Sequence, residues 1–419
     1  MHMRTTICKI FFLVLTLCIA APKANLAQER ATLTKSDRQF LLEFNIALDE
    51  ADKALQDRPY HYPDLQLFLL LRSKAKESFD DSELGEQLNA KAMFYHAKKL
   101  QLLRIYPNAI NYYSRAIDLG LKNTEIYLYR GKCFSELGEQ SQTNPLAYDL
   151  AIADYTEAIK YNGECVDSYL ARAVAKWRKA DINPILRTRP YDSKELLTSS
   201  NLDFNHCLRL EPNSAETLYY RASLFKRLSR LDQDTSDRYI TLEESDLSNL
   251  LDLKGEDCER YYFQAMHWLK TSWMHSRLEE DLKSKQCATT SLKLISKSIK
   301  QQPSFHMNSY LTRCDVYGLL EDRGNQLKDI NTIISNAPSL SIGYMQKGYF
   351  LENNNENEDA ITAYKQASLK SEKVHSNFSL SLLYRKLGMS EFADAAYQNS
   401  QQAKKNLEKY VNSFYSPTR

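Results

Sequence analysis

The sequence predicts an all-α protein, a right-handed α-solenoid of about eight helix–turn–helix repeats with an N-terminal helical cap. Three observations predict this fold. A unit of about 34 residues recurs along most of the chain. The eighth position of each unit is small, and the twenty-fourth, once insertions are allowed for, is large and apolar. Two antiparallel helices approach closely where a small side chain faces a large one.

The repeat is clearest in residues 307–340, where apolar or small residues recur at helical spacing at Tyr310, Cys314, Tyr317 and Ile330. Pro338 follows and stops the second helix, because proline cannot continue a helix. The eight units begin at Ala90, Thr124, Val166, Ala215, Cys258, Met307, Ser341 and Val374. A single repeated unit therefore accounts for residues 90–407.

The two diagnostic positions keep their character in every unit. Position 8 is Ala97, Gly131, Ala173, Ala222, Ala265, Cys314, Gly348 and Ser381. Position 24 is Tyr113, Tyr155, Phe204, Leu247, Ile295, Ile330, Tyr364 and Tyr397. The unit of about 34 residues, with its small position 8 and its large position 24, resembles the repeat of the tetratricopeptide repeat family. The resemblance implies a curved array whose first helices line the concave face, and a role in binding other proteins.

Insertions lengthen the gap between the two helices in units two to five, where a solenoid tolerates added length. The insert at 181–200 contains Pro184 and Pro190 and predicts a loop plus a short helix. The stretch 272–291 lacks Gly and Pro and predicts an extension of the two helices. Residues 28–89 are predicted to form a degenerate repeat or a cap, and 408–419 a C-terminal tail.

Residues 1–27 have the layout of a secretory signal peptide. Arg4 and Lys9 precede an apolar run at 10–20, and small residues follow. The run is too short to span a bilayer comfortably. The alternatives are an uncleaved anchor or a start codon placed too early. The sequence thus predicts an exported protein, periplasmic or secreted, or resident in the endoplasmic reticulum lumen of a eukaryote, with no other membrane association.

Arginine at position 7 and aspartate at position 23 occur in the same four units and are both missing from the other four. This co-occurrence predicts that the two side chains meet, since guanidinium and carboxylate form a bidentate pair. We assign these residues a structural role in helix packing. The pairs are Arg130 with Asp154, Arg172 with Asp203, Arg221 with Asp246, and Arg313 with Asp329.

The sequence carries none of the common catalytic or nucleotide-binding motifs. The histidines are scattered and no C-x-x-C pair is present, so neither a metal site nor a cofactor is predicted. Cys258 and Cys287 flank one helix–turn region and could be bridged in an exported protein.

The formal net charge is +2, and 2 − 3 = −1 without the three cations of 1–27. A near-neutral chain argues against nucleic acid as a partner, and we predict no enzymatic activity.

The resemblance implies that positions 2, 5, 9, 12 and 13 of each unit point into the concave face. Units three to five place aromatic side chains interleaved with cationic ones there, which favours an extended or acidic peptide as partner. The alternative is that Tyr219 and Tyr262 only pack between repeats. The candidate residues are Lys132, Trp177, Arg178, Tyr219, Lys226, Arg227, Tyr262 and Lys270. We therefore predict a non-catalytic scaffold or adaptor. A co-chaperone for unfolded clients is the alternative.

Overall fold

The computed structural model describes residues 41–48, 73, 83–141, 145–181, 190–231, 233–302, 304–370 and 373–415. The predicted signal peptide, most of the predicted N-terminal region and residues 416–419 lie outside these ranges. Within them the regular structure is helical, and no strand is present.

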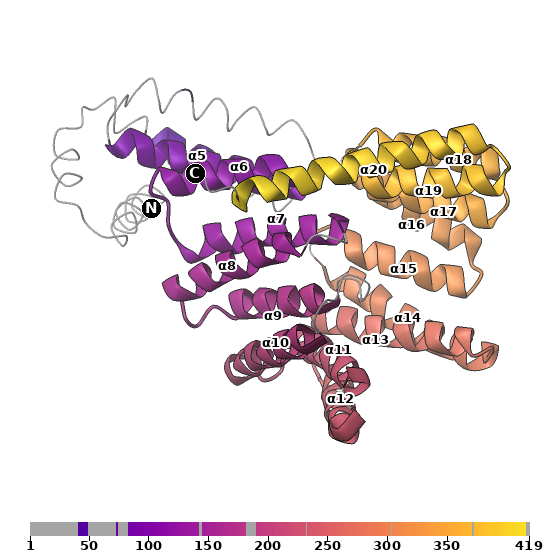
Figure 1. The fold of residues 1–419 in the computed structure, drawn as a ribbon. Coiled ribbons are helices and arrows are strands. Elements are labelled where there is room, and N and C mark those ends of the chain that lie inside the picture. Colours follow the sequence, from indigo (N-terminus) through magenta and orange to yellow (C-terminus); the bar gives the residue numbers. More distant parts are fainter. Residues whose placement is uncertain are drawn as a thin grey trace, which may run out of the picture.

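The helices follow one another as antiparallel pairs, from α5–α6 to α19–α20 (Figure 1). The first four pairs are α5 (Glu83–Leu102) with α6 (Tyr106–Asp118), α7 (Thr124–Ser141) with α8 (Leu146–Tyr161), α9 (Val166–Asp181) with α10 (Pro190–Leu210), and α11 (Ala215–Leu231) with α12 (Ser236–Asp252). The last four are α13 (Cys258–Arg277) with α14 (Asp281–Gln301), α15 (Met307–Leu319) with α16 (Arg323–Asn336), α17 (Ser341–Asn353) with α18 (Asn357–Ser368), and α19 (Lys373–Lys386) with α20 (Ser390–Asn412).

The sequence period places the helices accurately. From α7 to α17, every first helix begins at the residue predicted to open its unit. The predicted extension in unit five is confirmed, since α13 and α14 have 20 and 21 residues against 13 and 14 in α15 and α16. The prediction of a separate short helix within 181–200 is wrong for residues 190–200, which the structure describes. Pro190 instead opens α10, where its missing N–H and fixed φ suit a first turn.

Close approach of the paired helices depends on the small residue at position 8. All eight of these residues are buried. A Cβ added to Gly348 would lie 2.4 Å from the Tyr364 ring, and one added to Gly131 would lie 2.6 Å from the Tyr155 ring. The position-24 rings of Tyr155 and Tyr364 therefore occupy the space that the glycines leave empty.

Position 24 fails in the last repeat. Tyr397 is 37% exposed, and α20 instead buries Ala393, Ala396 and Ser400. At this point α20 packs on α19 through small side chains such as Ser400, whose Oγ donates to Val374 O.

The turns inside the repeats share one backbone feature, a residue of left-handed conformation at position 15. Arg104, Glu321 and Asn355 have φ of 56°, 59° and 62°, and Gly388 has φ of 74°. A left-handed residue after a helix lets the chain reverse and satisfies the last carbonyl groups. The recurrence of this turn explains why the uninserted repeats keep one length.

The first helices form an inner layer. The first helices α5, α7, α9, α11 and α13 each contact the first helix of the next pair, and α17 contacts α19. Second helices of neighbouring pairs make no comparable contact in the described part of the chain. We call the surface of the first helices the inner face. The array curls so far that α20 reaches back to α6, α7 and α8 (Figure 1). None of the described helices is long and apolar enough to cross a membrane.

Candidate functional site

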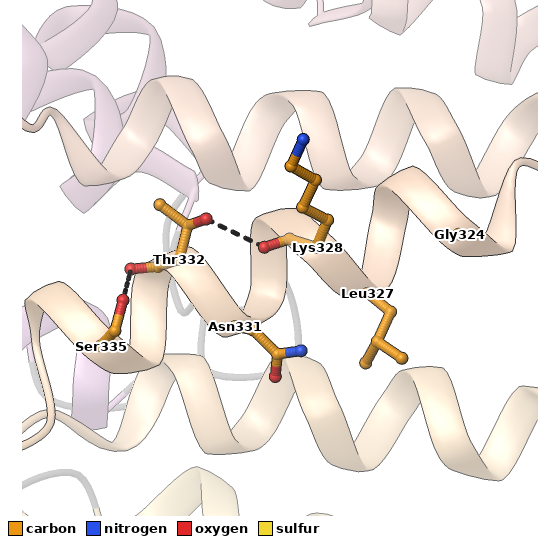
Figure 2. Close-up of a pocket in the computed structure, with 6 residues that line it drawn as sticks. All are labelled: Gly324, Leu327, Lys328, Asn331, Thr332 and Ser335. Atoms are coloured by element: carbon orange, nitrogen blue, oxygen red, sulfur yellow. Dashed lines mark hydrogen bonds between the residues drawn. The ribbon is translucent and has the colours of Figure 1, made fainter.

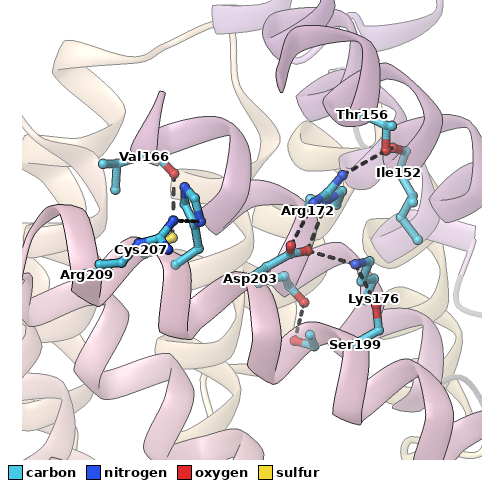
Figure 3. A network of polar contacts seen from close by, with 12 residues as sticks. Ile152, Thr156, Val166, Arg172, Lys176, Ser199, Asp203, Cys207 and Arg209 are labelled. Atoms are coloured by element: carbon cyan, nitrogen blue, oxygen red, sulfur yellow. Dashed lines mark hydrogen bonds and ion pairs between the residues drawn. The ribbon is translucent and has the colours of Figure 1, made fainter. Parts of the chain in front are cut away.

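The structure brings together all four Arg–Asp pairs, each through two hydrogen bonds. In the third repeat, Arg172 Nε and Nη2 donate to Asp203 Oδ2 and Oδ1 at 3.0 and 2.7 Å (Figure 3). Lys176 Nζ donates to the same carboxylate at 2.8 Å. The aspartate side chains are at most 7% exposed. These residues fasten the first helix of each repeat to the second through nearly buried carboxylates.

Burial also shifts the pKa of one of these carboxyl groups. Burial raises the pKa of Asp154 above its ordinary value, against the opposing hydrogen bonds from Arg130. Arg130 also donates from Nη1 to Ser114 Oγ at 3.0 Å, on the preceding repeat. The pair therefore joins three helices, α6, α7 and α8.

Three of the predicted inner-face cations already have acidic neighbours. Arg178 Nε lies 3.4 Å from Glu139 Oε1, and Arg227 Nε lies 2.9 Å from Asp181 Oδ1. Both pairs connect neighbouring repeats. Lys226 Nζ lies 3.6 Å from Glu243 Oε1, on the second helix of its own repeat. These cations hold the array together as well as lining it.

The predicted aromatic residues pack between consecutive first helices. The Tyr219 ring on α11 lies 5.5 Å from Phe263 on α13, and the Tyr262 ring on α13 lies 5.9 Å from the His306 ring at the start of α15. The Trp177 ring lies 6.1 Å from Tyr220, and its indole N–H has no hydrogen-bond partner among the residues that the structure describes. The packing role left open for Tyr219 and Tyr262 is thus present, and Trp177 keeps an unused donor.

Two lysines, Lys132 and Lys270, lie on the inner face without an ion pair among the described residues. Lys132 Nζ lies 5.7 Å from the centre of the Tyr129 ring, and Lys270 Nζ lies 3.4 Å from Ser223 Oγ. Burial lowers the pKa of Lys270, and Lys226 lowers it further. Glu243 opposes this lowering of the Lys270 pKa, so the positive charge of Lys226 and Lys270 is partly compensated by one carboxylate.

Two further basic residues, His267 and Arg230, act on or are affected by these lysines, and the sequence argument selected neither. Burial lowers the pKa of His267, and Lys270 and Lys226 add to that effect. Arg230 also lowers the pKa of Lys270. We call Lys226, Arg230, His267 and Lys270 the basic group. The basic group has members on both α11 and α13. An anion bound beside it would relieve the repulsion between its positively charged side chains.

The inner face also carries acids that sequence reasoning passed over. Burial raises the pKa of Glu216 to about 7, with Glu259 adding to the rise and Lys132 opposing it. Burial raises the pKa of Asp315 to about 6. Glu216 occupies position 2 and Asp315 position 9, so the rule that selected the cations would have found them.

Two hollows of the described surface lie away from the basic group. A shallow groove of about 570 Å³ follows one face of α16, lined by Gly324, Leu327, Lys328, Asn331, Thr332 and Ser335 (Figure 2). Its hydroxyl groups donate to backbone oxygens of the same helix, Thr332 to Lys328 O and Ser335 to Thr332 O. A second hollow of about 290 Å³ lies between the turn at 211–215 and the start of α13.

Among the described residues, no three His, Cys, Asp or Glu side chains are placed to hold a metal ion. All six cysteines from Cys133 to Cys314 are free thiols, Cys258 and Cys287 included.

No protein-family model and no curated protein matches the chain. Among solved structures, yeast Tom70 is similar with a TM-score of 0.54 and 14% identity, over 91% of this chain and 69% of that one. A tetratricopeptide repeat protein from Parabacteroides merdae has a TM-score of 0.35 and 15% identity, over 74% of this chain and 98% of its own. Human IFIT1, solved as a dimer with m7Gppp-AAAA, has a TM-score of 0.47 and 10% identity, over 84% and 77%. At these identities the likeness to Tom70 shows the fold alone, an α-solenoid of the tetratricopeptide type.

Proposed function

We propose that the chain is a non-catalytic scaffold that binds an extended, acidic segment of a partner protein on its inner face. The observation that carries this proposal is the basic group, together with Lys132 on α7. These side chains are half-buried or exposed on the inner face, and Lys132 and Lys270 lack a described carboxylate partner. Carboxylate groups of a partner would supply the missing acceptors.

The repeat geometry supports an extended ligand. Each repeat places the same positions on the inner face, so a bound chain meets similar side chains at regular intervals. Glu216 and Asp315 lie on the same face, and a segment bound there would place an uncharged or basic residue beside them. Near-neutral overall charge favours a protein over a nucleic acid, which needs a broad basic surface.

Reversing the two unpaired lysines tests the proposal. We expect Lys132→Glu combined with Lys270→Glu to weaken binding of short acidic synthetic peptides about tenfold or more, because two charge-assisted contacts become repulsive. Affinity is measured by fluorescence anisotropy, and unfolding by circular dichroism checks that the array is intact. The matched control is Lys300→Glu with Lys365→Glu, on exposed positions of the second helices α14 and α18.

Two results would contradict the proposal. One is equal affinity for acidic and basic peptides in the unmodified chain. The other is unchanged affinity in the doubly reversed variant. Binding of unfolded chains regardless of their composition would instead favour the co-chaperone alternative.

We also propose that the protein works outside the cytoplasm, with residues 1–27 as the export signal. The support is the short apolar run at 10–20 between a basic start and a series of small residues. We expect the exported chain to begin between residues 21 and 28. N-terminal sequencing of the protein recovered from the exported fraction measures this, and a recovered chain that still starts at Met1 would refute cleavage.

A further inference from the structure

The last helix is longer than its own repeat requires. α20 has 23 residues, whereas its partner α19 has 14. The first half of α20 packs on α19, where Ser400 Oγ donates to Val374 O at 2.8 Å. The second half continues through the polar stretch 401–406 and leaves its own repeat behind (Figure 1).

An apolar stripe follows at the end of this helix and in the short 3-10 turn Ser413–Tyr415 after it. Leu407, Tyr410 and Val411 lie on α20 at the spacing i, i+3 and i+4, which puts them on one side, and Phe414 lies in the turn. Val411 is fully buried in the hydrophobic cluster of α5–α8, and the other three pack against that cluster. These four apolar side chains therefore contact the cluster of α5–α8 rather than solvent alone.

Specific contacts fix the tip on the second repeat and its neighbour. The Tyr410 hydroxyl donates to Pro107 O at 2.7 Å and lies 2.9 Å from Asn111 Oδ1. The Phe414 ring meets the Phe134 ring edge to face, with 5.3 Å between the centres. The hydrogen bond to Pro107 joins residues 303 positions apart. We call this contact the clasp.

The clasp differs in kind from the other helix contacts of the described chain, which join helices of the same or of neighbouring repeats. In a solenoid each repeat touches only its neighbours, so small changes at each junction add up to a change of curvature. A contact between the second and the eighth repeat removes that freedom.

We propose that the tip of α20 is a releasable clasp that closes the array on itself and sets its curvature. When the tip leaves its seat, the repeats stay folded and the solenoid opens. The polar stretch 401–406 lets the tip detach without exposing further apolar surface. The clasp is independent of what the inner face binds, so it stands even if the acidic-peptide proposal fails.

The test uses the full chain and the substitution Val411→Asp, which places a charge in the buried seat. We expect amide hydrogen exchange at 403–412 to become about tenfold faster or more, because an undocked helix end frays. Exchange at 390–400 should stay the same, and small-angle X-ray scattering should give a larger radius of gyration. Asn406→Asp adds the same charge at an exposed position of α20 and keeps the acceptor for Gln402, so it should change neither measurement.

A milder variant keeps the experiment decisive if Val411→Asp disturbs folding. Tyr410→Phe removes only the hydroxyl, and we expect faster exchange at 403–412 in the same direction. The proposal is overturned if both variants leave exchange and scattering unchanged. It is also overturned if protection of 403–412 rises with protein concentration together with a dimer mass, because the tip would then dock on a second copy.

Discussion

Replacing Asp246 by alanine is expected to lower the free energy of unfolding by about 3–5 kcal/mol. The Asp246 side chain is 3% exposed and accepts from Arg221 Nε at 2.8 Å and from Nη2 at 2.6 Å. Its removal leaves a largely buried guanidinium with Asn205 Oδ1 as its remaining described acceptor. An uncompensated buried charge costs far more than the pair contributes when intact. Urea unfolding followed by circular dichroism measures the loss.

The control lies on the same helix. Glu244→Ala removes an exposed carboxylate from α12 and should change the unfolding free energy by less than about 0.5 kcal/mol. The double variant Arg221→Met with Asp246→Leu removes both charges, and we expect it to be much more stable than Asp246→Ala. A double variant as unstable as Asp246→Ala would show that the carboxylate acts through something other than Arg221.

The sequence could predict the Arg–Asp pairs because each pair lies within one repeat. The pattern of presence and absence across repeats reports a contact that the local hairpin must make. The same holds for position 8, where Gly131 and Gly348 match the tyrosines that fill the space beside them. Both features repeat, so one chain supplies its own comparison.

Contacts between repeats were harder to predict. The ion pairs of Arg178 with Glu139 and of Arg227 with Asp181 depend on how far each repeat is rotated relative to the last. The period of the sequence does not fix that rotation, and the inserts at units two to five change the spacing further. The sequence shows the charge of these arginines but not their neighbours. It therefore predicted that they were free to bind a partner, although each has an acidic neighbour.

The clasp could not be predicted from the sequence, for a different reason. Residues 408–419 were assigned as a tail, whereas α20 runs through 408 to Asn412. The stripe from Leu407 to Phe414 is visible in the sequence, but a stripe does not identify the surface that covers it. Its seat on α6–α8 exists only because the repeats curl through nearly a full circuit (Figure 1). That curl is the sum of many small angles, which local patterns do not specify.

Replacing Gly348 by valine is expected to cost about 3 kcal/mol of unfolding free energy. Its Cβ would lie 2.4, 2.5 and 2.8 Å from atoms of the Tyr364 ring, closer than van der Waals contact allows. Tyr364 is fully buried and its hydroxyl donates to Glu352 Oε2 at 3.0 Å, so the ring cannot turn away cheaply. Thermal and urea unfolding measure the loss.

The matched control is Gly324→Val, because a Cβ at Gly324 would meet only Asp322 Oδ1 at 3.9 Å. We expect that variant to unfold within about 0.5 kcal/mol of the unmodified chain. Combining Gly348→Val with Tyr364→Leu should cost less than the two single changes added together, since the smaller leucine makes room for the added methyl groups. Strictly additive costs would mean that the two residues do not compete for the same space. The small residue at position 8 would then not be what lets the paired helices approach.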